Sequence, residues 1–230
     1  MIPHLSFQDI HNLEILEAIY TTPEYDYYWS EDFSPEFYID LAKRGFIAID
    51  IIDEGEEYLL PEMQPAYALL EHEELHISHH VKKLLNQQRY VLRINTHLKE
   101  IIQGIQTAYE DCWIHPKYEA LLHQLSNIED DTFQLMATAL IDTHTQTMVA
   151  GEIGYIIHHH HYVGLTKFSL KDKSKPNLGT LQRVLLTNYL TQEKDIHLSN
   201  LGQPQMEYKL ALGAKVYPRT AFLKRCGFIK

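Results

Sequence analysis

Three consecutive segments in the second half of the chain most constrain its fold. Residues 133–141, 148–158 and 162–170 are rich in apolar and β-branched side chains, and short polar spacers separate them. Strand-like runs joined by such short connections are typical of neighbouring antiparallel strands. The sequence therefore predicts an antiparallel sheet at the centre of the molecule.

Helical patterns surround this run. Apolar side chains recur at helical spacing over 98–109, 116–125, 181–190 and 205–212. A further short strand is predicted at 90–94. Helices packed on a mostly antiparallel central sheet define the α+β class, which is the fold class we expect.

The N-terminal part begins with a helix and a strand. Ser34 is a helix cap, Pro35 suits the first helical position, and Gly45 ends the helix. The apolar run 46–52 then predicts a buried strand. A turn follows it, and we expect the prolines at both ends of 61–65 to make the chain irregular there.

Charge is distributed unevenly along the chain, whose net charge is −11. Residues 1–75 contain eighteen Asp and Glu but only two Lys and Arg, whereas residues 164–230 contain four acidic and twelve basic residues. Such asymmetry indicates parts that face different partners, although ordinary solvated surfaces also produce it. We predict an acidic N-terminal domain, 1–75, and a second domain, 76–230.

Several classes of protein are disfavoured. No apolar run reaches the ~18 residues of a membrane-spanning helix, and the start lacks the pattern of a secretory signal. The cysteines, Cys112 and Cys226, are expected to be free thiols in a cytoplasmic protein. Glycine-rich phosphate loops and nucleophile motifs are missing, and the run 158–161 (four histidines) is predicted to be a hairpin tip. We expect no metal and no cofactor.

Collinear motifs carry a family resemblance over about 190 residues. The chain resembles the leucyl/phenylalanyl-tRNA–protein transferases in segments of matching order and spacing. These segments are Asp32-Phe-Ser-Pro-Glu36 with Lys43-Arg44-Gly45, Leu75-His-Ile-Ser78 with Lys82-Lys83, Trp113-Ile114, Val149-Ala-Gly151 through Gly164-Leu-Thr-Lys-Phe168-Ser169, Gln203, and Leu212-Gly-Ala through Pro218-Arg219 and Phe222-Leu223.

This resemblance implies a fold, an activity and a site. It implies a small N-terminal domain, a C-terminal domain of the GNAT acyltransferase type, and transfer of an aminoacyl group from charged tRNA to an N-terminal Lys or Arg of a protein. The partners would be aminoacyl-tRNA and a protein with a basic N-terminus. From the lack of long apolar runs we expect no membrane partner. The implied site comprises Gln203 as the catalytic residue, a substrate pocket of Trp113, Ile153, Tyr162, Leu165 and Leu201, and Lys82 and Lys83 as tRNA-binding residues.

The chain also departs from the family pattern. Leu165 and Leu201 stand where the family has carboxylates, so Gln203 is expected to lack its polar partner and the pocket to be more apolar. Two alternatives remain open: a non-catalytic relative that binds tRNA or a degron, and an acyl-CoA-dependent acyltransferase using the loop 175–180. The sequence indicates neither the group transferred nor the oligomeric state.

Overall fold

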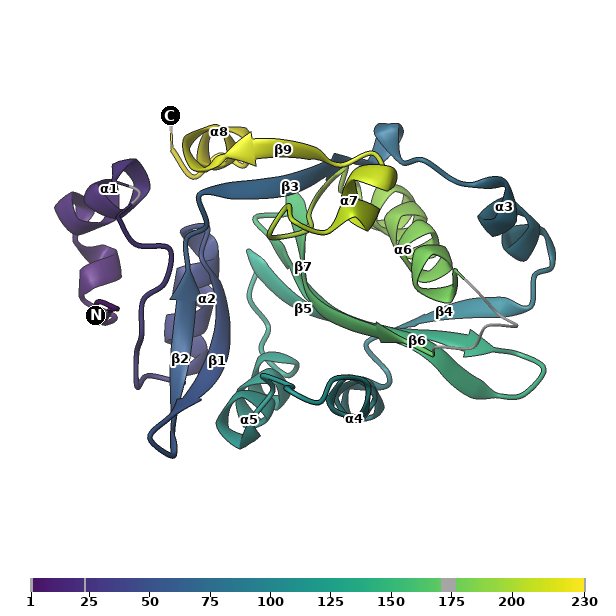
Figure 1. Cartoon of the computed structure of the whole chain (residues 1–230), viewed down its shortest axis with the longest axis horizontal. Coiled ribbons are helices and arrows are strands. Elements are labelled where there is room, and N and C mark those ends of the chain that lie inside the picture. The colour runs from purple at the N-terminus through teal and green to yellow at the C-terminus, as the bar shows by residue number, and fades with distance from the viewer. Residues whose placement is uncertain (1, 23, 171–176, 230) are drawn as a thin grey trace.

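The computed structural model describes residues 2–22, 24–170 and 177–229. Within them the main element is a seven-stranded sheet of order β4-β5-β6-β7-β8-β3-β9 (Figure 1). Every neighbouring pair is antiparallel except β7–β8. The strands are β3 (Ala66–Glu71), β4 (Tyr90–Ile94), β5 (Phe133–Asp142), β6 (Thr147–Ile157), β7 (His161–Ser169), β8 (Leu198–Asn200) and β9 (Lys215–Pro218). The predicted α+β class with a mostly antiparallel sheet is confirmed.

Helices cover both faces of this sheet (Figure 1). α4 (Leu98–Ala108) and α5 (Pro116–Leu125) lie on one face, and α6 (Leu178–Lys194) lies on the other. α4 buries an apolar stripe of isoleucines, which the helical spacing predicted. α3 (His79–Asn86) packs on the first turns of α6, and α7 (Glu207–Ala211) follows β8.

The N-terminal part contains α1 (Leu13–Thr21), α2 (Pro35–Lys43) and a hairpin of β1 (Ile47–Asp53) and β2 (Glu56–Glu62). As predicted, Ser34 caps α2, and its Oγ accepts a hydrogen bond from the Phe37 backbone N–H at 3.3 Å. The structure adds elements that the sequence patterns did not indicate: the strands β2, β3 and β9, the helices α1 and α8 (Arg219–Arg225), and the short 3-10 helices Asp9–His11 and His72–Glu74.

One core joins the N-terminal part to the large sheet. Tyr38 of α2 and Tyr118 of α5 are fully buried, and their hydroxyl groups lie 3.0 Å apart. Tyr118 also donates a hydrogen bond of 2.6 Å to the Ala48 carbonyl of β1. Because β3 pairs with β8 and β9, the acidic segment contributes a strand to the large sheet. The domain boundary after residue 75 stays a prediction.

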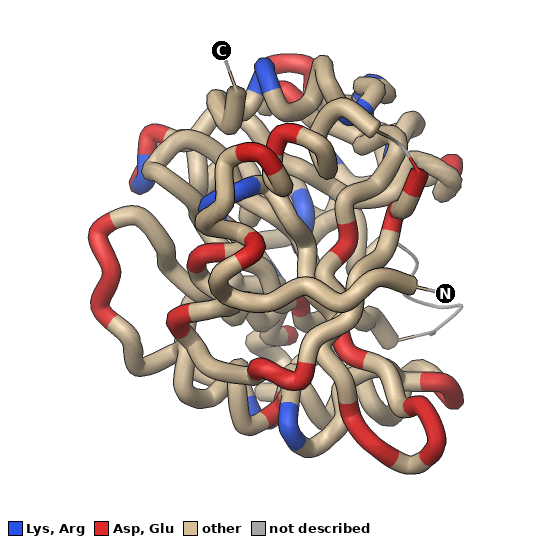
Figure 2. Tube along the Cα trace, turned by 90° about the vertical axis from the view of Figure 1, so that its left-hand side faces the viewer, with Lys and Arg blue, Asp and Glu red and all other residues tan. Residues whose placement is uncertain are grey.

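Part of the uneven charge is explained by pairing within the fold. The end of the molecule that carries α1, α2 and the β1–β2 hairpin has many acidic and few basic residues (Figure 2). Three basic residues near the C-terminus bind carboxylates of the acidic segment: Arg219 with Asp26, Lys215 with Glu74, and Arg225 with Glu71. The basic and acidic segments therefore partly neutralise each other. Lys171, Lys173, Lys175 and Lys230 lie outside the described residues.

Candidate active site at the β6–β7 bulge

A bulge between β6 and β7 positions the candidate site. Ile153 pairs with Thr166 and Gly154 pairs with Gly164, which leaves Leu165 as an extra residue on β7. An extra residue bends a strand and turns side chains out of strict alternation. Four consecutive residues of β7, from Gly164 to Lys167, accordingly line one pocket of about 330 Å³.

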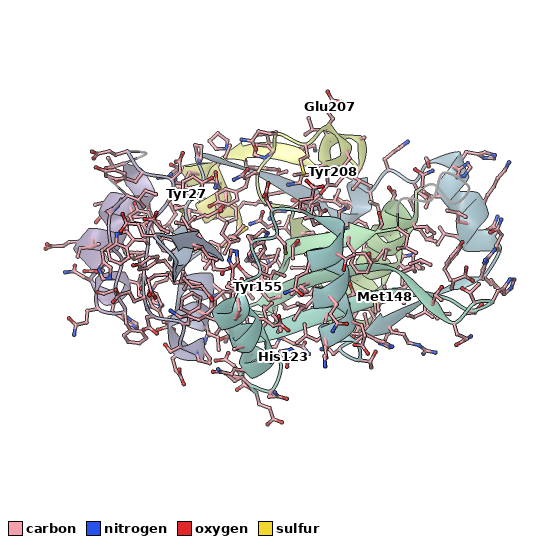
Figure 3. The ribbon with its side chains drawn as sticks, turned by 60° about the horizontal axis from the view of Figure 1, so that its bottom comes forward. Tyr27, His123, Met148, Tyr155, Glu207 and Tyr208 are labelled. Atoms are coloured by element: carbon pink, nitrogen blue, oxygen red, sulfur yellow. The ribbon has the colours of Figure 1, made fainter. Side chains whose placement is uncertain are left out.

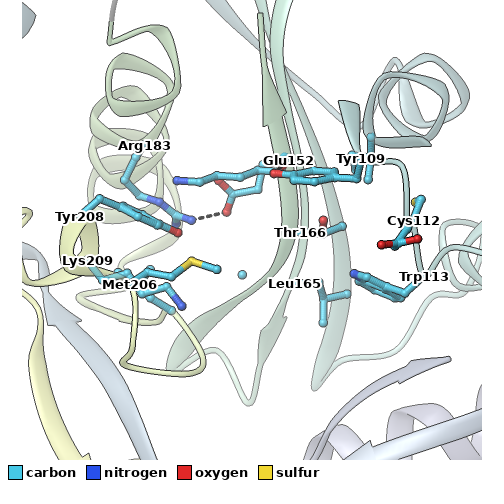
Figure 4. Close-up of a pocket in the computed structure, with 15 residues that line it drawn as sticks. Tyr109, Cys112, Trp113, Glu152, Leu165, Thr166, Arg183, Met206, Tyr208 and Lys209 are labelled. Atoms are coloured by element: carbon cyan, nitrogen blue, oxygen red, sulfur yellow. Dashed lines mark hydrogen bonds and ion pairs between the residues drawn. The ribbon is translucent and has the colours of Figure 1, made fainter. Parts of the chain in front are cut away.

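The pocket has two chemically different walls (Figure 4). The first comes from α4 and the loop after it, together with the bulge, and is largely apolar and aromatic: Ile105, Tyr109, Cys112, Trp113 and Leu165. The second comes from α6, from α7 and from Met206 just before it, and it carries the cations Arg183 and Lys209 together with Met206 and Tyr208. Lys167 of β7 adds its ammonium to this cationic wall, because it faces the ring of Tyr208. Asp111, Glu152, Gly164, Thr166 and Leu201 complete the lining. On α7, Glu207 points outward while Tyr208 lies on the side toward the sheet (Figure 3).

A buried ion pair lies between these walls. Glu152 and Arg183 are 1% and 4% exposed, and Nη2 of Arg183 donates a hydrogen bond to Oε1 of Glu152. The hydroxyl of Tyr162 donates to the same Oε1 at 2.9 Å. A Cβ at Gly164 would lie 3.1 Å from both charged groups, so glycine allows their close approach to β7.

The ion pair is incompletely satisfied. Oε2 of Glu152 and both Nε and Nη1 of Arg183 are buried and have no hydrogen-bond partner among the described residues. Buried polar atoms without partners are uncommon, so this ion pair is less completely satisfied than buried polar groups usually are.

Two lysines add positive charge without an ion-pair partner in the described part of the chain. The ammonium of Lys167 lies 4.3 Å from the ring centre of Tyr208, and Nζ of Lys209 donates a 2.6 Å hydrogen bond to the Gln203 carbonyl. Burial lowers the pKa of each lysine from 10.5 to about 8, and the nearby Arg183 adds to the effect. Both lysines are thus mainly charged at neutral pH and exchange protons readily near pH 8.

Three of the five predicted pocket residues line this cavity: Trp113, Leu165 and Leu201. Ile153 and Tyr162 are fully buried and do not line it. Ile153 belongs to the core cluster under α4. Tyr162 belongs to the cluster under α6 and reaches the site only through its hydrogen bond to Glu152.

Gln203 lies beside the pocket, because its carbonyl accepts the hydrogen bond from Lys209. Its side-chain Nε2 donates to the Tyr27 hydroxyl at 3.2 Å, and its amide lies close enough to the Glu62 carboxyl to lower the pKa of that group. The expectation that Gln203 lacks a polar partner was therefore wrong. The carboxylate comes from β2 instead of position 201. Burial raises the pKa of Glu62 to about 7, against the opposing hydrogen bonds from Gln64 and Gln203.

The predicted tRNA-binding lysines lie apart from the pocket. Lys82 and Lys83 are exposed on α3. Val81 of the same helix packs against Leu178 and Leu181 of α6, the helix that also carries Arg183. α6 therefore connects α3, which carries the predicted tRNA-binding lysines, with the pocket.

Sequence reasoning missed Glu152, Lys167, Arg183, Tyr208 and Lys209. The sequence does contain a pattern that could have indicated the ion pair of Glu152 and Arg183. Glu152 is the one charged residue in the otherwise uncharged segment 147–157, and Arg183 follows closely on Leu181 in a helix that buries apolar residues. Charged residues are rarely fully buried without a partner, so the two positions were candidates for pairing.

The histidine run behaves largely as predicted. His158 to His160 form the turn between β6 and β7, while His161 is buried at the start of β7. Among the residues that the structure describes, no group of three or more His, Cys, Asp or Glu is arranged to hold a metal ion. In that same part of the chain, no helix is long and apolar enough to cross a membrane.

Comparison with known protein families shows which family the chain belongs to. The family model described as leucyl/phenylalanyl-tRNA protein transferase matches residues 69–227. The chain belongs to this family. The match includes every residue that lines the pocket, and it confirms the resemblance found in the sequence motifs. It makes the protein a member of an aminoacyl transferase family.

Solved structures resemble the chain only distantly. L-PGS from Bacillus licheniformis is 11% identical with a TM-score of 0.43, over 82% of this chain and 55% of that one. A tandem GNAT protein from the clavulanic acid biosynthesis pathway is 10% identical with a TM-score of 0.40, over 84% and 64%. A GCN5-related N-acetyltransferase from Kribbella flavida is 11% identical with a TM-score of 0.42, over 91% and 71%. The chain thus spans about half the length of L-PGS. No curated protein sequence matches it.

Proposed function

We propose that the chain transfers an aminoacyl group from charged tRNA to a protein whose N-terminal residue is Lys or Arg, as a cytoplasmic enzyme of an N-degron pathway. In this reaction the α-amino group attacks the ester carbonyl, a C–N bond forms, and the C–O bond to the tRNA breaks. The amine loses a proton and the departing ribose hydroxyl gains one, so no oxidant or cofactor is consumed. Family membership supports this class of reaction.

The observation that carries the proposal is the two-walled pocket at the bulge. Its volume of about 330 Å³ is at the lower end of the range for small-molecule sites. Trp113, Leu165 and Leu201 offer apolar surface to an aminoacyl side chain such as leucine. Burial of such a side chain contributes about 1.5–3 kcal/mol of binding free energy.

The cationic wall suits the chemistry. Attack on the ester produces a tetrahedral oxyanion, and preorganised positive groups stabilise such an ion strongly in a site that excludes water. Lys167 and Lys209 supply a positive potential next to the apolar wall. Since the pKa of each is about 8, these lysines also suit proton transfer near neutral pH.

Gln203 remains our candidate for orienting the attacking amine. An amide both donates and accepts hydrogen bonds, and Tyr27 and Glu62 restrict its geometry. Lys82 and Lys83 remain candidates for phosphate contacts further along the tRNA, because they are exposed and adjacent on one helix.

Transfer assays test the proposal. The purified chain is incubated with tRNA charged with labelled leucine or phenylalanine and with peptides that begin with Arg, Lys or Ala. We expect label on the Arg and Lys peptides only, and at least tenfold slower transfer by Trp113→Ala, or about 1.4 kcal/mol of barrier. The other tryptophan, Trp29, lies outside the pocket, so Trp29→Ala is the matched control once both variants are shown to fold.

Two results contradict this function. Binding of charged tRNA without transfer to any peptide favours a non-catalytic relative. Transfer from acetyl-CoA, but not from charged tRNA, favours the acyl-CoA-dependent alternative. The loop 175–180, which the acyl-CoA alternative would use to bind its donor, begins outside the described residues.

A further inference from the structure

The lysines of the pocket lack the partners that buried cations normally have. Lys209 is only 6% exposed, and its Nζ is bound to a neutral backbone carbonyl. Lys167 is half-buried, and its ammonium faces the ring of Tyr208. Within the described part of the chain, neither lysine forms an ion pair with a carboxylate. A buried ammonium without a counter-ion costs free energy, so such a pair is a ready binding site for an anion.

The nearest carboxylate is already engaged. Glu152 lies opposite Lys167 in the strand register, but Oε1 of Glu152 accepts hydrogen bonds from Arg183 and Tyr162. Glu152 thus neutralises Arg183. Asp111, the other carboxylate that lines the described pocket, forms no ion pair with Lys167 or Lys209. Their charges also repel each other, because Lys209 helps to lower the pKa of Lys167. An anion between them relieves both the desolvation and the repulsion.

The surroundings favour a nucleotide phosphate over a carboxylate. Tyr109 and Tyr208 line the pocket and are 49% and 42% exposed as residues. Exposed aromatic residues beside cations are typical of sites that bind single-stranded nucleic acid. A carboxylate is best matched by a bidentate guanidinium, and Arg183, the one arginine that lines the described pocket, already binds Glu152. Lysines act as point charges toward phosphate.

We propose that Lys167 and Lys209 bind the phosphodiester that precedes the terminal aminoacyl-adenosine of the donor tRNA. This inference rests on the proposed function, since it assigns the donor end of tRNA to the pocket. It adds a phosphate subsite on the cationic wall, and that subsite fixes how deeply the tRNA end enters. The aminoacyl group then lies toward Trp113 and Leu165 on the opposite wall (Figure 4).

Ligands that differ only in charge test the subsite. The first is a cytidyl-adenosine dinucleotide with leucine attached by a stable amide to its 3′ end. The second has a methylphosphonate, which is uncharged and of similar size, in place of the phosphodiester. We expect wild-type protein to bind the phosphodiester about tenfold more tightly, the effect of one charge-assisted hydrogen bond, as measured by calorimetry.

Variants connect that preference to the lysines. Lys167→Met and Lys209→Met should each reduce the preference at least threefold and leave affinity for the methylphosphonate ligand unchanged, whereas Lys209→Arg should retain it. The slope of log Kd against log salt should fall by about one when a phosphate contact is lost. Lys99→Met, at an exposed position on α4, is the matched control and should behave as wild type.

Each outcome separates this inference from the proposed function. Equal binding of the two ligands by wild-type protein overturns the subsite, even if aminoacyl transfer is observed. A preference that both Met variants retain also overturns it. Variants that keep the preference but transfer more slowly to the Arg and Lys peptides indicate that the lysines act on the acceptor instead. A preference abolished by the Met variants supports the subsite, even if no peptide is modified.

Discussion

Two buried cationic regions of this protein differ in how their donors are satisfied. The first surrounds Arg219, at the start of α8, where the chain returns to the N-terminal part. All three guanidinium nitrogens donate hydrogen bonds, and the acceptors are the carbonyls of Ile19, Thr22, Tyr25, Met63 and Gln64 and the carboxylate of Asp26. The second is the pocket, where Arg183 has two nitrogens without partners and the lysines lack ion pairs among the described residues.

The difference indicates which charges serve stability and which serve binding. A buried cation with a full set of acceptors joins the segments that supply them, and its removal leaves those acceptors unsatisfied. A buried cation with unused donors gains little in the folded protein and becomes satisfied only when a ligand is present. We therefore expect Arg219 to stabilise the fold, and Lys167 and Lys209 to bind a ligand.

The largest effect is expected at Arg219. Arg219→Met should lower the free energy of unfolding by about 3–5 kcal/mol, because it leaves the buried carbonyls of Ile19, Met63 and Gln64 without their donor. Urea unfolding measures it. Arg225→Met, which removes an exposed ion pair with Glu71, is the control and should cost less than about 1 kcal/mol. Equal losses in the two variants contradict the architectural role.

A smaller effect is expected on catalysis at Gln203. Gln203→Ala should slow aminoacyl transfer at least tenfold, equivalent to about 1.4 kcal/mol of barrier, because it removes the amide that Tyr27 and Glu62 hold in place. Single-turnover rates with saturating charged tRNA measure it. Gln205→Ala, at an exposed position two residues later, should retain the wild-type rate. A Gln203→Ala variant as fast as its parent removes Gln203 from the mechanism.

Glu62 should give a pH dependence of stability. The pKa of Glu62 is about 7 in the folded protein against 4.5 for an unperturbed glutamate, so the folded state binds the proton more tightly. The contribution to stability is fully present below pH 4.5 and is lost as the pH rises toward 7. Unfolding of wild type and Glu62→Gln across this range should show a falling stability difference. A constant difference means that Glu62 does not titrate in this window.

The smallest effect, of opposite slope, is expected at Lys209. Its pKa is about 8 in the folded protein against 10.5, so the unfolded chain binds the proton more tightly between these values. The free energy of unfolding should therefore rise between pH 8 and 10.5 in wild type relative to Lys209→Met. Solvent in the open pocket screens the charge and reduces the size of the effect. Parallel pH profiles for the two proteins contradict an unpaired, desolvated lysine.

Much of the framework follows from local sequence patterns. The strand run after residue 133, the amphipathic helices around it and the Ser34 cap are set by neighbouring residues, so periodicity and capping rules predict them. The collinear motifs likewise identified the family, and three of the apolar positions that they indicated, Trp113, Leu165 and Leu201, line one cavity.

Only the tertiary structure decided which distant residues meet. β3 pairs with β8 and β9, which lie more than a hundred residues later, and no local pattern contains that information. The amide of Gln203 meets the Tyr27 hydroxyl and lies near the Glu62 carboxyl of β2, and the pocket unites α6, α7 and the bulge of β7. A charged residue in a sequence shows neither its burial nor its partner, because both depend on long-range packing. The sequence by itself thus determined the family and the local elements, and folding determined which buried charges were left unpaired.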